Sequence, residues 1–332
     1  MIAAALYVRG GASNGVGGII PDLNPEPAAL VCIPELATVC EGIAGDGVEV
    51  TIEEAGQTAD ALAGTDEVEH DAWLTLAPWP QIAAEARGRE LGRDLPPSGE
   101  RLARSPVVMV VSAERARVLD AECGAPLSWR CLGRVAGLAW SSVGGEETWG
   151  QVKPGFTDPS LSATGLLVVG QAAGDFLQKE LSVRAMQTDA FLAWSSQLER
   201  GVPSHGTSAN SPLQQRVQIG VASFDVVGTT EAEAGPLLAS TARAKGLELR
   251  YPETVVVAEV VLAPLRDNSG ADRLRDLLAE SGGSALAAAG WRVEGEPPAA
   301  GVPAAPQLPD ESNLPEAGVL DALRAQWEEI QR

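Results

Sequence analysis

Three hydroxyl side chains, Ser160, Ser162 and Thr164, follow Asp158-Pro159 and precede an apolar run. Asp, Ser and Pro at such a position predict the start of a helix, expected here over Pro159–Gln171. Free backbone N–H groups and the positive dipole end at a helix N-terminus suit an anion or a carbonyl. The hydroxyl residues are therefore interpreted either as part of a ligand cradle or as an ordinary helix cap.

A second polar group, Thr229, Thr230 and Glu231, follows the predicted strand Ser223–Val227. These residues are placed to close on a ligand from one side of a cleft. A helix cap followed by an acid in the first turn explains the same residues. In a cleft, Glu231 would repel an anion and favour a cationic or neutral ligand.

An aromatic residue lies at the end of another predicted strand, Asp71–Ala77, which is followed by Pro78 and Trp79. At the mouth of a cleft, Trp79 would stack on a ligand. The alternative is that Trp79 packs under the next predicted helix, Trp79–Leu91.

Patterns for catalysis are poor. The two histidines, His70 and His205, are expected on the surface. Gly11–Gly15 matches G-x-S-x-G but lacks the strand–turn–helix context that a nucleophile elbow needs. No P-loop or complete G-x-G-x-x-G is found in the sequence, and two histidines cannot supply a His-rich metal site. We therefore expect no enzyme activity, no cofactor and no metal.

The charge balance excludes some partners. The 332 residues include 45 Asp and Glu against 24 Lys and Arg, which gives a net charge of -21. Nucleic acids and anionic lipid surfaces bind clustered cations, so neither is expected as a partner. With 45% hydrophobic residues the chain has enough apolar material for a packed core.

The four cysteines form two sets, each eight residues apart: Cys32 with Cys40, and Cys123 with Cys131. Four cysteines allow three connectivities, of which local pairing is the simplest. A continuous helix rises ~12 Å over eight residues, too far for a disulfide, so each local pair requires a bend. Pro34 lies within the first pair, and Gly124 and Pro126 lie within the second. Two disulfides would indicate an extracytoplasmic compartment; four free buried thiols are the alternative.

The first eight residues are apolar, too few for a bilayer core that needs ~20. They are interpreted either as the end of an N-terminal membrane anchor or as a frayed terminus. A Gly-, Ser- and Pro-rich linker follows, up to residue 26. Beyond it, short apolar runs alternate with helical patterns, which favours parallel α/β sheets. Residues 296–314 are expected to be a Pro/Ala linker, and 315–332 an amphipathic helix that packs on its own domain.

The order of these elements resembles a type 2 periplasmic solute-binding protein. Three stretches carry the resemblance: Ala103–Ser112 as a first crossing between lobes, Thr157–Gly170 as a helix facing the cleft, and Tyr251–Val260 with Gly290-Trp291 as the return crossing and close. It covers roughly residues 27–294 and extends to the substrate-binding-like domains of high-GC bacteria. The usual Ser-rich loop after the first strand is replaced by Cys32-Ile-Pro34-Glu35.

The resemblance implies a two-lobed α/β fold, with lobe 1 formed by 27–105 and 247–295 and lobe 2 by 106–246. It implies capture of a small solute between the lobes by an extracellular or envelope-anchored monomer, which works with an ABC permease or another envelope protein. The alternative is an envelope interaction or scaffold module that keeps the fold without binding a ligand. The expected ligand-binding residues are Pro34, Glu35, Pro78, Trp79, Ser160, Ser162, Thr164, Thr229, Thr230 and Glu231.

Overall fold

The computed structural model describes residues 26–45, 47–65, 67–99, 101–124, 127–178, 181–301, 308–309 and 312–332. The predicted anchor remnant, and all of the predicted N-terminal linker except residue 26, lie outside these ranges. Within them, no helix is both long enough and apolar enough to cross a membrane.

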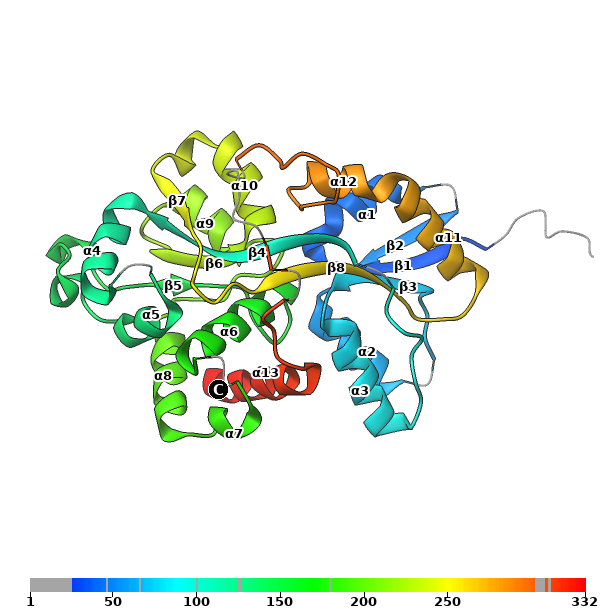
Figure 1. The fold of residues 1–332 in the computed structure, drawn as a ribbon, viewed down its shortest axis with the longest axis horizontal. Helices are drawn as coiled ribbons and strands as arrows, with labels where there is room; N and C mark the ends of the chain where they lie inside the picture. The colour runs from blue at the N-terminus through cyan, green and yellow to red at the C-terminus, as the bar shows by residue number, and fades with distance from the viewer. Residues whose placement is uncertain are drawn as a thin grey trace, which may run out of the picture.

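The strands form one open sheet in the order β2-β1-β3-β8-β4-β6-β5, with β7 added beside β4. We call the half that contains β2, β1, β3 and β8 lobe 1, and the half that contains β6, β5 and β7 lobe 2 (Figure 1). The strands are β1 (Ala28–Cys32), β2 (Val48–Ile52), β3 (Ala72–Leu76), β4 (Arg101–Ser112), β5 (Pro154–Gly155), β6 (Val226–Thr230), β7 (Leu247–Arg250) and β8 (Val257–Pro264).

Helices cover both lobes. Those of lobe 1 are η1 (Pro34–Leu36), α1 (Ala37–Ile43), α2 (Ala55–Gly64), α3 (Trp79–Leu91), α11 (Ser269–Leu277), η5 (Leu278–Gly282) and α12 (Gly283–Ala288). Those of lobe 2 are α4 (Ala113–Cys123), α5 (Trp129–Val135), η2 (Trp140–Val143), η3 (Glu147–Trp149), α6 (Ala163–Phe176), α7 (Val183–Met186), α8 (Asp189–Arg200), α9 (Pro212–Ile219), α10 (Glu231–Ser240) and η4 (Ala242–Ala244).

The long strand β4 joins the lobes. Its first part, Arg101–Pro106, pairs with β8, whereas its second part pairs with β6 and β7. The continuous apolar run Val107–Val111 is buried throughout, as expected of a strand covered on both faces. The chain returns to lobe 1 between β7 and β8. Because β7 pairs with Met109–Ser112, residues 247–250 lie with lobe 2.

The alternation of strands and helices predicted parallel sheets, but the sheet is mixed. β1 pairs in parallel with β2 and β3, and β5 with β6. β8 is antiparallel to both β3 and β4, and β4 is antiparallel to β6. The difference arises because β4 and β8 run in opposite directions between the lobes. Strands joined as βαβ units would have been parallel.

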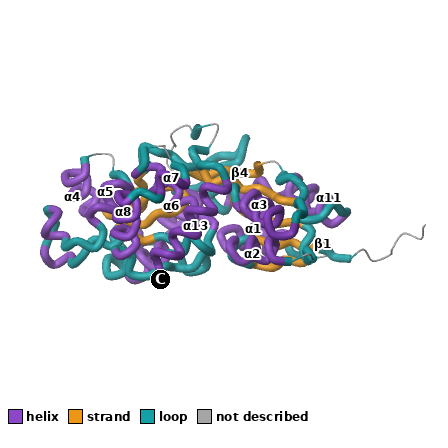
Figure 2. The backbone as a smooth tube through the Cα atoms, turned by 90° about the horizontal axis from the view of Figure 1, so that it is seen from below, coloured by secondary structure: helices purple, strands orange, loops and turns teal. Residues whose placement is uncertain are grey.

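The C-terminal helix α13 (Ala317–Gln331) contacts both lobes, and Figures 1 and 2 show it lying between them. It packs on α3 of lobe 1 and on α6, α7 and α8 of lobe 2. Trp327 is fully buried, and its indole N–H donates to Glu199 of α8 at 2.8 Å. On the opposite side, Arg324 pairs with Asp60 of α2 at 3.0 Å. The predicted amphipathic helix is therefore confirmed, and it serves as a bridge between the lobes.

The anchoring of α13 can be measured. Trp327→Ala removes a fully buried indole and is expected to lower the free energy of unfolding by about 3–5 kcal/mol. Urea unfolding gives this value. Glu329→Ala, which changes an exposed residue of the same helix, is the control and should change it by less than about 0.5 kcal/mol. An equal effect of the two substitutions would show that α13 is not docked.

Candidate ligand-binding site

A polar cavity of about 200 Å³ lies between the lobes. Lobe 1 contributes the loop after β1, the first turn of α1 and the end of α12. Lobe 2 contributes the starts of α6, α9 and α10. The lining residues are Pro34, Glu35, Thr38, Thr157, Thr164, Ser208, Ser211, Gln214, Thr230, Ala232, Glu233, Ala289 and Trp291.

The carboxylate of Glu35 crosses from lobe 1 to the N-terminus of α6. Its Oε1 accepts hydrogen bonds from the Ser162 hydroxyl at 2.9 Å and from the Thr164 N–H at 3.0 Å. Its Oε2 is buried and has no hydrogen-bond partner in the described part of the chain. A carboxylate at this position satisfies a free N–H group and interacts favourably with the helix dipole.

A disulfide fixes the loop that carries Glu35. Cys32 at the end of β1 bonds to Cys40 in α1, with Cα atoms 6.6 Å apart, and the turn at Pro34 provides the required bend. The second predicted pair, Cys123 with Cys131, is also a disulfide and connects α4 to α5. Both local pairings are thus confirmed. The first holds Glu35 within a closed loop, which limits the positions open to its carboxylate.

The start of α6 is built by its own hydroxyl groups. The Ser162 side chain accepts from the Gly165 N–H at 3.1 Å and so caps the helix. Asp158 accepts from both the N–H and the hydroxyl of Ser160, so Ser160 belongs to the turn and does not line the cavity. Thr164 does line it. The helix begins four residues later than predicted because Asp158-Pro159 forms a turn ahead of the cap.

Two further contacts join the lobes beside the cavity. Ser208 of lobe 2 donates to Glu54 of lobe 1 from its N–H at 3.3 Å and from its hydroxyl at 2.7 Å. The Gly56 N–H donates to the Leu161 carbonyl at 2.9 Å. A Cβ at position 56 would lie 2.1 Å from the Ser160 carbonyl oxygen, so this approach requires glycine. These contacts close one side of the cleft.

Glu233 is a second carboxylate in the cavity wall, on α10. It accepts hydrogen bonds from the hydroxyls of Ser211 and Thr229. Burial raises its pKa, whereas those two hydrogen bonds lower it, and the net direction is upward. Burial likewise raises the pKa of Glu54, with the charge of Glu35 adding to the rise. Two further acidic side chains therefore lie near Glu35 in a poorly solvated place, where burial disfavours their charged forms.

Glu231, an expected ligand contact, lies behind the cavity wall. Its carboxylate is fully buried and accepts from the Arg292 guanidinium at 2.6 and 2.8 Å and from the Tyr251 hydroxyl. Burial raises the pKa of Tyr251, and the hydrogen bond to Glu231 raises it further. Glu231 joins the start of α10 to the segment after α12 and does not line the cavity.

Pro78 and Trp79 also lie away from the cavity. Trp79 is fully buried at the start of α3, and the Arg324 guanidinium of α13 lies 5.5 Å from the centre of its ring. Its aromatic face is thus covered by a residue of this chain. Thr229 is a neighbour of the site through its bond to Glu233, and Thr230 lines the cavity while capping α10.

Sequence reasoning brought together Pro34, Glu35, Thr164 and Thr230 but missed the rest of the lining. Glu233 carried a signal, because Thr230-x-x-Glu233 has the spacing of a capping box. Ser211-Pro212 had the pattern of a helix start for α9. Thr38, Ser208 and Ala289 carried no comparable signal, because only the tertiary fold brings them to the cavity.

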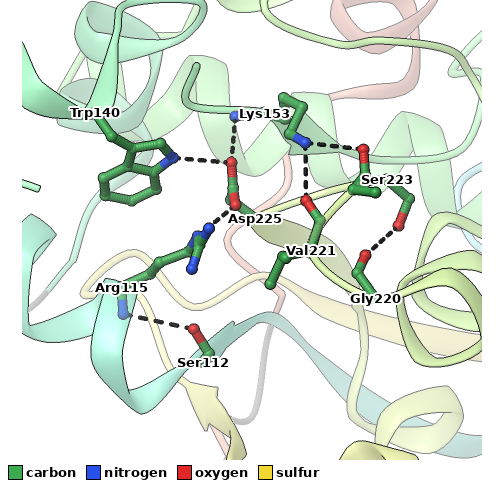
Figure 3. Close-up of polar contacts among 9 residues, drawn as sticks. Ser112, Arg115, Trp140, Lys153, Gly220, Val221, Ser223 and Asp225 are labelled. Atoms are coloured by element: carbon green, nitrogen blue, oxygen red, sulfur yellow. Dashed lines mark hydrogen bonds and ion pairs between the residues drawn. The ribbon is translucent and has the colours of Figure 1, made fainter. Parts of the chain in front are cut away.

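A second polar cluster, buried in lobe 2, surrounds Asp225, the residue just before the start of β6 (Figure 3). Asp225 accepts from the Arg115 guanidinium at 2.5 Å, from the Trp140 indole N–H at 3.1 Å and from the Lys153 N–H at 3.0 Å. The Arg115 guanidinium also lies 4.4 Å from the ring centre of Trp149. Both carboxylate oxygens are partnered, so this cluster fixes the strand that ends at Thr230.

The fold has clear counterparts among solved structures. The chain matches a periplasmic thiamin binding protein over 95% of this chain and 98% of that one, with 14% identity and a TM-score of 0.59. The chain has the fold of periplasmic solute-binding proteins. AfuA of Actinobacillus pleuropneumoniae, with fructose-6-phosphate bound, matches with 12% identity over 92% and 96% of the two chains and a TM-score of 0.56. SubI, a sulfate-binding protein of Mycobacterium tuberculosis H37Rv, matches with 17% identity over 81% of this chain and 88% of that one, with a TM-score of 0.51.

These matches confirm the predicted two-lobed fold of the solute-binding proteins. No family model and no curated protein sequence matches the chain. At these identities the likeness establishes the fold alone.

One titratable group, in the loop between α8 and α9, is linked to α13 through Glu199. His205, expected on the surface, is partly buried and lies 2.6 Å from Glu199, the carboxylate that also accepts from Trp327. Burial lowers the pKa of His205, but the hydrogen bond and charge of Glu199, with the charge of Asp158, outweigh it and raise the pKa above 6.5.

A raised histidine pKa stabilises the folded state fully below about pH 6.5, and this contribution is lost as pH rises through the folded-state pKa. The difference in unfolding free energy between the native protein and His205→Gln should therefore shrink as pH is raised from 6 to 8.5. Urea unfolding at four pH values measures it, with His70→Gln as the control. A difference that grows with pH would contradict the ion pair.

Proposed function

We propose that the chain captures a small solute in the inter-lobe cavity, as a binding protein of an ABC importer. The observation that carries this proposal is a polar cavity whose walls come from both lobes of a solute-binding fold. Hydroxyl, amide and carboxylate groups line it and offer directional hydrogen bonds. Its volume of about 200 Å³ is enough for a small solute, since a cavity of about 150 Å³ holds benzene.

The proposed mechanism is closure of lobe 1 on lobe 2 about β4 and the segment between β7 and β8. Lobe 1 would move as residues 27–105 together with most of 247–295, and lobe 2 as 106–246. The contacts of Glu35, Glu54 and Gly56 across the cleft would form in the closed state. These lobe-to-lobe hydrogen bonds would then hold the cleft closed around the solute.

We further propose an extracytoplasmic location and a monomeric protein that delivers its solute to a permease. Two disulfides support the compartment, because such bonds persist where the environment is oxidising. Similar structures include periplasmic proteins that bind thiamin and fructose-6-phosphate. Attachment through an N-terminal membrane segment remains part of the proposal.

The second candidate is an envelope scaffold that keeps the fold without taking up a solute. One observation favours it: α13 packs on both lobes and would resist their separation. Large apolar side chains filling the cleft near Ser160 and Thr229 would also favour it. The lining of the cavity is mainly polar instead, which supports solute binding over this alternative.

Ligand-screened thermal melting tests the proposal. A bound solute at a hundredfold excess over Kd should stabilise the protein by about 2.7 kcal/mol. Gln214→Ala, which removes an amide from the cavity wall, should weaken the response, whereas Gln218→Ala on the exposed side of the same helix should leave it unchanged. If a broad metabolite library produces no shift, the scaffold function is favoured.

Closure can be tested separately through Gly56. Gly56→Ala places a methyl group against the Ser160 carbonyl and should lower affinity for the captured solute by about tenfold or more, because the lobes cannot approach fully. Gly64→Ala, with no atom within 4 Å of the added methyl group, is the control on the same helix. Small-angle scattering should show a larger radius of gyration for Gly56→Ala alone. Unchanged affinity would argue against closure at this contact.

A further inference from the structure

The Glu35 carboxylate lies at the N-terminus of α6, where free N–H groups would otherwise bind an anion. We propose that the cavity takes a small organic cation, an amine or quaternary ammonium compound, and that Glu35 determines this charge preference. The inference rests on the proposed function, because it names the class of solute that the same cavity binds. It depends on what Glu35 already contacts, on what it leaves unpaired and on the charges around it.

The N-terminus of α6 is already used. The Thr164 N–H and the Ser162 hydroxyl both donate to Glu35 Oε1. An oxyanion entering the cavity would find these donors taken and would meet a carboxylate at short range. Two like charges in a poorly solvated site repel strongly, so sulfate or a phosphate is disfavoured unless Glu35 withdraws.

The other oxygen of the same carboxylate lacks a partner. Glu35 lines the cavity, and its Oε2 is buried without a hydrogen-bond donor in the described part of the chain. A buried carboxylate oxygen left unpaired is destabilising, and a charged N–H donor compensates it better than a neutral one. This oxygen is, however, closed to a water-sized molecule, so a ligand gains from the carboxylate through its charge and not through a direct hydrogen bond to Oε2. A positive charge in the cavity gains the most from it.

The other ionisable side chains described at the cavity are also acidic, so none of them brings a positive charge. Glu233 forms part of the wall, and Glu54 bonds to the lining residue Ser208. None of the residues found to line the cavity, all of them in the described part of the chain, is Lys, Arg or His. Trp291 adds an aromatic side chain, whose ring face attracts cations. Acidic groups and an aromatic side chain around about 200 Å³ fit a compact cation.

Matched probes test the charge preference on the native protein. Choline and putrescine are cations of suitable size; 3,3-dimethylbutan-1-ol is a neutral isostere of choline, and sulfate is the anion. Thermal melting and calorimetric titration, run alongside a metabolite library sorted by charge, should show binding of cations and no binding of the isostere or sulfate. A neutral or anionic library solute that binds in place of cations would overturn the inference and leave the proposed function standing. A library without any binder would overturn both.

Variants test the role of Glu35. Glu35→Gln keeps the size of the side chain and should weaken cation binding roughly tenfold or more. Glu35→Ala frees the start of α6 and should acquire a melting shift with sulfate that the native protein lacks. Glu41→Gln, an exposed acid in α1, is the matched control and should do neither. If cation binding is unchanged in Glu35→Gln, Glu35 does not determine the charge preference. The probe panel decides the charge preference even if a variant does not fold.

Discussion

A carboxylate of lobe 1 placed on a helix N-terminus of lobe 2 is the interaction around which the cleft is organised. Glu35 bonds to the start of α6, and both sides of that bond are prepared in advance. On one side the Cys32–Cys40 disulfide limits the loop, and on the other Ser162 caps the helix and turns its hydroxyl toward Glu35. Because each partner is fixed within its own lobe, this hydrogen-bonded group helps to set how the two lobes meet, together with the contacts of Glu54, Gly56 and α13.

The elements of the fold followed largely from local patterns. The predicted helix Trp79–Leu91 coincides with α3, because it begins next to a strong signal, Pro80 in the first turn. The mixed sheet was not predicted. Strand direction depends on how β4 and β8 pass between the lobes, and side-chain periodicity carries no information on direction.

The cleft was predicted only in part, for a similar reason. Glu35 and Thr164 follow elements whose ends face the cavity, so position along the chain was enough to find them. Glu231 was the wrong acid to place in its wall, because Arg292, distant in sequence, draws that carboxylate behind it and leaves Glu233 at the surface of the cavity. The bridging position of α13 could not be predicted from the sequence either, since its apolar face is the same whether it covers one lobe or two.

The disulfides have a consequence for how the chain matures. In each bond the two cysteines are only eight residues apart, and the second bond lies wholly after the first in sequence. A loop this short closes with a small entropic penalty, so the correct partner is far more concentrated than any other thiol. Where the environment is oxidising, each pair can therefore form its bond as soon as its own segment emerges. The native connectivity is then reached by order of emergence, with no need for disulfide reshuffling.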